Sequence, residues 1–152
     1  VDDVSFSPEV EKSIVINDAP AGSYSDEVVL NITDDSEVEK YSEKITGIIV
    51  NSVTYRVSDY SGPSGATFTG DMLFGPSGSL GSVAINGLNL STASGSGEEF
   101  ALDLSQSEVD AIAEQLKVNK TLVVIMAGTF SDGPVSLVIH VKIDATIEAD
   151  AL

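Results

Sequence analysis

The chain has 152 residues, 24 acidic side chains against 7 basic ones, one histidine and no cysteine, for a formal net charge of −17 at pH 7. This length suits a single domain, and a hydrophobic content of 42% predicts a packed core. Such a negative surface repels nucleic-acid phosphate and anionic lipid headgroups, so we expect no nucleic-acid partner. The longest apolar run, 122–127, is too short to span a bilayer, so we expect no membrane insertion of the mature chain.

Most of the sequence alternates apolar and polar side chains with a period of two, which is typical of half-buried strands. The predicted strands, in chain order, cover 12–17, 27–32, 48–58, 67–74, 80–85, 99–104, 122–130 and 135–147. We expect the first two to form an opening pair. The run 122–130 is apolar at nearly every position, which predicts a central strand covered on both faces.

Glycine-containing turns separate several of these strands. Asp132-Gly133 predicts a tight hairpin between the last two strands. The motif Gly-Pro-Ser-Gly occurs at 62–65 and again at 75–78, and both copies predict hairpin-end turns. The segment 86–98 is rich in Gly, Ser and Thr, and we expect it to be a mobile loop.

Two short helices are expected between the strands. Ser105 and Glu108 have the spacing of a capping box and precede apolar residues at helical spacing. The run Ser36-Glu-Val-Glu39 is a weaker version of the same signal. The sequence therefore predicts a mainly β protein, with residues 1–152 forming a single antiparallel β-sandwich of about eight strands and two short crossover helices. A partly closed barrel is the alternative.

Most catalytic chemistry is excluded by composition. Zinc sites and thiol chemistry need cysteine and histidine clusters that this chain lacks. The one histidine, His140, lies on the polar face of the last strand, where a solvent-facing histidine is more typical than a catalytic base. We therefore predict no catalytic residues, with a carboxylate-pair hydrolase as an alternative because two of the many acids could converge in space.

The acidity has three interpretations: a solubility or high-salt adaptation, a cation site, or attraction to a basic partner. No cofactor is required, but calcium is the one that the composition permits, because it prefers carboxylate and carbonyl oxygens. The candidate ligands flank predicted strand ends: Asp18, Asp26, Glu27, Asp34, Asp35 and Glu37. Asp35 or Ser36 also suits a helix N-cap. Tyr24 and Tyr60, near predicted loops, are candidate contacts for a ligand such as a glycan.

The order of elements resembles the exported all-β domains of surface lipoproteins from Bacteroidetes bacteria. In those domains a strand pair precedes a short helix and a long strand of the type Ile45–Tyr55, and an amphipathic helix and a closing hairpin like Thr121–Thr146 follow. The N-terminal cysteine that carries the lipid in such proteins is missing here. The resemblance implies a surface or periplasmic setting and a binding or structural role, and it transfers no site residue.

Together these features predict a non-enzymatic, exported module that acts through contact with a protein partner, as an adhesion, assembly or accessory subunit. We expect an extracellular, periplasmic or cell-surface location. An edge strand, or the segments 17–27 and 86–98, would provide the contact surface. A glycan- or calcium-binding β-sandwich is the alternative, and the sequence does not set the partner's identity or the oligomeric state.

Overall fold

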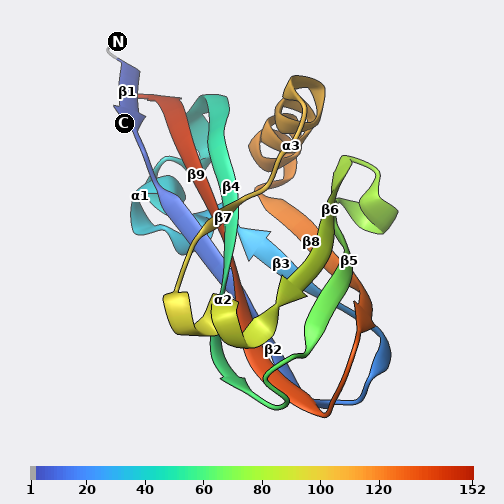
Figure 1. Ribbon diagram of the computed structural model, residues 1–152. Coiled ribbons are helices and arrows are strands. Elements are labelled where there is room, and N and C mark those ends of the chain that lie inside the picture. Colours follow the sequence, from blue (N-terminus) through green and yellow to red (C-terminus); the bar gives the residue numbers. More distant parts are fainter. Residues whose placement is uncertain (1–2) are drawn as a thin grey trace.

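The computed structural model describes residues 3–152 and places nine strands in two antiparallel sheets that pack against each other (Figure 1). Sheet A contains β1 (Asp3–Phe6), β2 (Glu9–Ala19), β4 (Ile45–Ser61), β7 (Phe100–Ala101) and β9 (Val135–Asp150). Sheet B contains β3 (Gly22–Asn31), β5 (Thr67–Phe74), β6 (Gly81–Asn89) and β8 (Thr121–Phe130). The predicted β-sandwich is confirmed, with two separate sheets rather than a barrel.

One long strand lies at the centre of each sheet. In sheet A, β9 pairs with β1 and β2 along one side and with β4 along the other, and β7 adds two residues beyond β4. In sheet B, β8 lies between β3 and β5, and β6 forms the edge beyond β5. The side chains of both central strands alternate, so each directs one face into the core and the other away from it.

The turn at Asp132-Gly133 joins β8 and β9, but these strands do not form the predicted hairpin. They belong to different sheets, so the turn is a corner between the sheets. The opening strands β2 and β3 are also divided between the sheets, as are β4 and β5 on either side of 62–65. The second Gly-Pro-Ser-Gly copy does lie in a hairpin, between β5 and β6. A sharp turn followed by an apolar strand is compatible with either arrangement, because both bury the same apolar faces.

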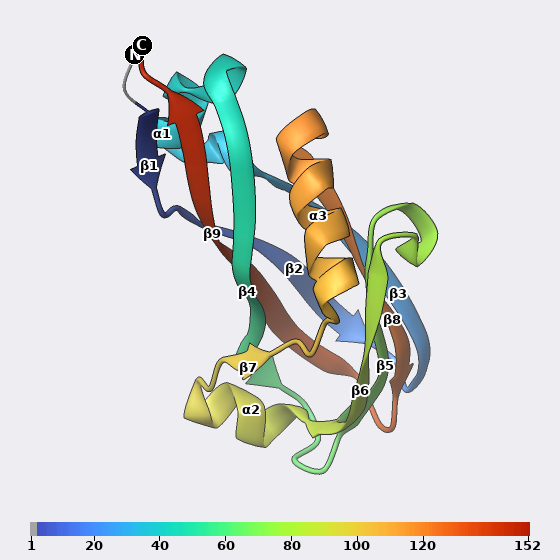
Figure 2. The same ribbon diagram turned by 90° about the horizontal axis from the view of Figure 1, so that it is seen from above.

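Three α-helices complete the fold: α1 (Ser36–Lys40), α2 (Leu90–Ser96) and α3 (Gln106–Asn119). Short 3-10 turns cover Ile32–Asp34 (η1), Ser42–Lys44 (η2) and Pro76–Gly78 (η3). The predicted capping box is confirmed at the start of α3, which lies between β4 and β6 in Figure 2 and buries Ile112 and Leu116. None of the helices in the described residues is long and apolar enough to cross a membrane.

Helix α2 occupies the segment that the sequence predicts to be a loop. Its N-cap is Asn89, whose side chain accepts a hydrogen bond from the Thr92 N–H, and it buries Leu90 and Ala93 against the core. The prediction of a loop across 86–98 is therefore wrong for residues 86–96, which form the end of β6 and α2. The mobility of this segment stays a prediction.

Candidate functional site

The outer face of sheet A is a network of paired charges centred on β9. Lys142 Nζ lies 3.1 Å from a Glu9 carboxylate oxygen and 2.8 Å from one of Glu99. Glu99 also accepts a 3.1 Å hydrogen bond from Thr54. These contacts lower the pKa of the Glu99 carboxyl, chiefly through Lys142, and raise the pKa of Lys142. The charges on this face are therefore largely satisfied within the chain.

His140 lies on the same face of β9, two residues before Lys142. Its Nδ1 is 2.9 Å from Ser13 Oγ and its Nε2 is 2.7 Å from Ser58 Oγ, so the ring bridges the strands on either side of β9. Burial lowers the pKa of His140, and the nearby Arg56 guanidinium lowers it further. Glu11, 3.6 Å from Nδ1, is also paired with Arg56 at 3.5 Å. Both ring nitrogens thus have partners in the sheet, and the His140 side chain is only 16% exposed, so it is less solvent-facing than the sequence predicts.

The six predicted calcium ligands are spread over three places. Asp18 lies at the end of β2, where its N–H donates to Ser136 Oγ at 3.0 Å. Asp26 and Glu27 lie in the middle of β3, whereas Asp34 ends η1, Asp35 is the N-cap of α1 and Glu37 lies within α1. Within residues 3–152 no group of three or more His, Asp or Glu side chains is arranged to hold a metal ion. Calcium binding therefore stays a prediction. The structure does not bring the six predicted ligands together in one site.

The acids at η1 and α1 have other contacts. The Asp35 carboxylate accepts hydrogen bonds from the N–H groups of Glu37 and Val38, at 2.9 and 3.1 Å, and caps α1 as predicted. Asp34 lies 3.9 Å from Lys12 Nζ.

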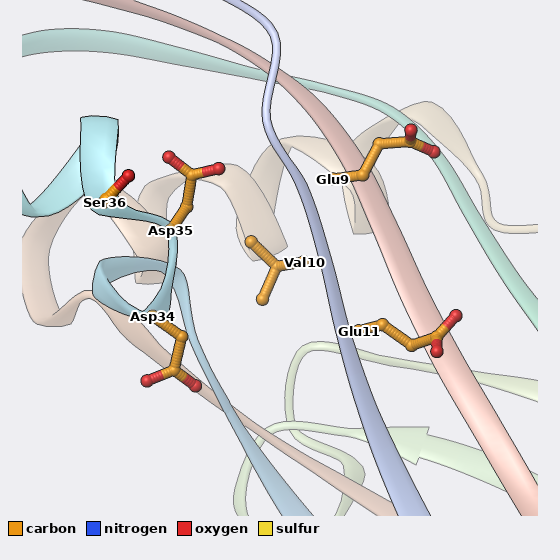
Figure 3. Close-up of a pocket in the computed structure, with 6 residues that line it drawn as sticks. All are labelled: Glu9, Val10, Glu11, Asp34, Asp35 and Ser36. Atoms are coloured by element: carbon orange, nitrogen blue, oxygen red, sulfur yellow. The ribbon is translucent and has the colours of Figure 1, made fainter.

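A recess of about 390 Å³ separates these acids from β2, lined by Glu9, Val10, Glu11, Asp34, Asp35 and Ser36. Figure 3 shows Glu9 and Glu11 on the side of β2 opposite Val10, turned away from Asp34 and Asp35. Glu9 and Glu11 already pair with Lys142 and Arg56 in sheet A. The four carboxylates therefore do not converge in this recess.

Both candidate tyrosines have hydroxyl partners within the chain. Tyr24 donates to Asp26 at 3.1 Å and packs its ring 5.2 Å from that of Phe130, and burial with the nearby Asp26 raises its pKa to about 12. The Tyr60 hydroxyl donates to the Pro63 carbonyl. These contacts tie the two side chains into the sandwich, and a role in ligand binding stays a prediction for both.

The outer face of sheet B has few charges and an apolar centre, whereas the outer face of sheet A combines its charge network with the exposed apolar residues Val15 of β2 and Ile49 of β4. Along β8 the even-numbered residues Leu122, Val124 and Met126 are buried, whereas Val123 and Ile125 are only half-buried on the opposite face. The neighbours of these two residues on the same face include Val29 of β3, which is 45% exposed, and Leu73 of β5. An apolar cluster of Val29, Leu73, Val123 and Ile125 therefore faces outward.

The apolar run 122–130 indicated this cluster, but the sequence alone did not show that one face of the strand points outward. The continuous apolar run correctly predicts a central strand with two apolar faces. The expectation that the chain covers both is wrong, because only the inner face of β8 is buried in the core. The outward residues Val123 and Ile125 were therefore missed as surface residues.

Comparisons with known proteins identify no family for this chain. No protein-family model matches it, and no curated protein does. A solved structure titled Desmodium yellow mottle tymovirus aligns over 100% of this chain and 92% of that chain, with 10% sequence identity and a TM-score of 0.37. A likeness at that level carries no argument about this protein.

Proposed function

We propose that this protein is a non-enzymatic, exported module that works by protein–protein contact, and that the outer face of sheet B is its contact surface. The observation that carries the proposal is the apolar cluster on that face. Contiguous apolar patches on a protein surface favour contact with a partner, because covering them releases about 25 cal/mol for each Å² removed from water. An adhesion, assembly or accessory role fits such a surface.

The adjoining edge strand supports the same conclusion. No charged residue occurs between residues 72 and 97, a range that includes all of β6, although the chain as a whole carries a net charge of −17. Edge strands are commonly protected by charged side chains, as the opposite edge of this sheet is by Asp26 and Glu27 on β3. The strand β6 carries no charged side chain of its own, and only its start is covered, by Glu108 of α3.

Part of that edge is open to a partner's backbone. The Ser82 N–H donates to the Glu108 carboxylate of α3 at 3.0 Å, so it points away from β5. Because backbone groups alternate in direction along an antiparallel strand, the N–H and C=O of the exposed Ala84 also point away from β5. The face and the β6 edge form one continuous surface for a partner.

Site-specific photo-crosslinking in the native cells tests this proposal. A photoreactive amino acid at Ile125 replaces an outward side chain on the central strand of sheet B. Val138 is the matched control, because it is an aliphatic, half-buried residue on the outer face of the central strand of sheet A. We expect a discrete adduct with one protein from position 125 and none from position 138. Equal adducts from both positions, or none from 125, would contradict the proposal.

A further inference from the structure

We infer that the partner presents an apolar centre flanked by lysine or arginine side chains. This inference rests on the proposed contact function and adds the chemistry of the partner. The outer face of sheet B carries two carboxylates, Glu27 and Asp71, and they flank the central strand from opposite sides. Glu27 of β3 is the register partner of Ile125, and Asp71 of β5 is the register partner of Ala127.

Cross-strand partners on one face of a sheet lie about 5 Å apart at their Cβ atoms. The two carboxylates are therefore placed at the borders of the apolar cluster, one on each neighbouring strand. A partner that covers Ile125 must also cover or approach both acids.

Neither acid is neutralised by the chain itself. The ion pairs found in residues 3–152 link Lys12 to Asp34, or join Arg56, His140 and Lys142 to acids of sheet A, and none includes Glu27 or Asp71. The remaining basic residues belong to the α1–η2 region and to the end of α3: Lys40, Lys44, Lys117 and Lys120. The two acids of this face therefore have no basic neighbour within the described residues.

This arrangement selects between partners. Covering an unpaired carboxylate with an apolar or acidic surface carries a desolvation or repulsion cost, whereas a lysine or arginine placed opposite it offsets that cost. A second copy of this chain fits poorly, because it would bring the same acids and a further charge of −17 to the contact. The surface therefore fits a basic partner and disfavours self-association.

Defined peptides allow this inference to be tested on the purified protein. Three peptides of equal length are compared: one alternates Val with Lys, one alternates Ser with Lys, and one alternates Val with Ser. Their binding is followed by the amide chemical shifts of the protein at low and at high salt. We expect only the Val–Lys peptide to shift the amides of β8 and its neighbours in a saturable way at both salt concentrations. The Ser–Lys peptide should bind diffusely and be released at high salt, because exposed charges are screened.

The double variant Glu27→Gln/Asp71→Asn should weaken binding of the Val–Lys peptide by about tenfold. The control Asp144→Asn/Glu148→Gln makes the same change in net charge on the outer face of sheet A, along β9. We expect the control to change the affinity by less than about twofold, since both of its positions lie outside the contact.

Three outcomes would overturn the inference: equally tight binding of the Val–Ser peptide to β8, equal weakening by both double variants, or a dimer of the wild-type protein formed through this face. Each of these leaves the contact function standing, because the face would still bind a protein surface. If no peptide shifts β8 and crosslinking at position 125 matches that at position 138, the contact function itself fails.

Discussion

The outer faces of the two sheets differ in their charges: sheet A carries a network of ion pairs, whereas sheet B carries few charged side chains around an apolar centre. In sheet A, the central strand β9 presents His140, held by side chains of β2 and β4, and Lys142, held by Glu9 of β2 and by Glu99, which precedes β7. In sheet B, the central strand β8 presents Val123 and Ile125, with few charges around them. A face that satisfies its own polar groups gains little from a partner, whereas an apolar face gains from being covered.

The comparison depends on the register of sheet B, because a one-residue shift would turn Val123 and Ile125 inward. Gly128 allows β5 and β8 to approach closely in this register, since a Cβ at this position would clash with the Thr69 carbonyl oxygen and the Gly70 Cα. We expect Gly128→Ala to lower the unfolding free energy by about 3 kcal/mol, because backbone of β5 must move. Chemical denaturation measures this loss.

Gly47→Ala is the control for that experiment. Gly47 lies in β4 of sheet A, and a Cβ there would meet no atom within 4 Å. We expect a change below about 0.5 kcal/mol. Equal losses for the two variants would show that the close pairing of β5 and β8 is absent.

The two faces of β8 can be compared with one chemical change made at adjacent residues. Val124 is fully buried, so Val124→Thr places a hydroxyl in the core and should cost about 1–3 kcal/mol. Val123 faces outward, so Val123→Thr should cost less than about 0.5 kcal/mol. Thermal or urea unfolding of both variants gives the difference, and similar costs at both positions would mean that the outer face is covered.

The polar face of sheet A should respond to pH through His140. Burial holds the pKa of His140 below its ordinary value of 6.5, so the unfolded chain binds the proton more readily than the folded protein does. We therefore expect full stability from this group above pH 6.5 and a progressive loss as the pH falls below that value. His140→Gln should remove this part of the pH dependence, and it is a clean probe because the chain has no other histidine.

The smallest expected effect concerns the ion pairs around Lys142. The Lys142 ammonium is the chief cause of the lowered pKa of Glu99. Lys142→Met keeps the apolar stem but removes the charge, so the pKa of Glu99 should rise toward 4.5. Carboxyl chemical shifts during an acid titration report this change, and an unchanged pKa would show that the network on sheet A is not formed in solution.

The sequence predicted the fold class and the positions of most strands, but it did not predict which strands pair. Period-two alternation located most strands, and the serine–glutamate spacing located the start of α3. The corner at Asp132-Gly133 was misjudged as a hairpin, because a tight turn does not determine whether the strands it joins pair or face each other across the core. Helix α2 was missed because its Ser- and Gly-rich sequence has low helix propensity, and burial of Leu90 and Ala93 outweighs that propensity.

The sequence indicated only part of the proposed contact surface. The apolar run of β8 revealed two apolar faces, but alternation alone cannot show whether the same chain covers both. The acids chosen as calcium ligands were judged from their positions along the chain. Their distribution over β2, β3 and α1 depends on which sheet each strand joins, and that arises only from the three-dimensional pairing.

The central claim is that a protein partner covers the outer face of sheet B. Its most direct test is the affinity of the partner captured at position 125 for two matched variants, Ile125→Ser and Val138→Ser. Central, fully covered side chains dominate interface energies. We therefore predict that Ile125→Ser weakens the complex by about 30-fold or more, and that Val138→Ser changes it by less than about twofold. Equal affinities for the two variants would contradict the assignment of this face.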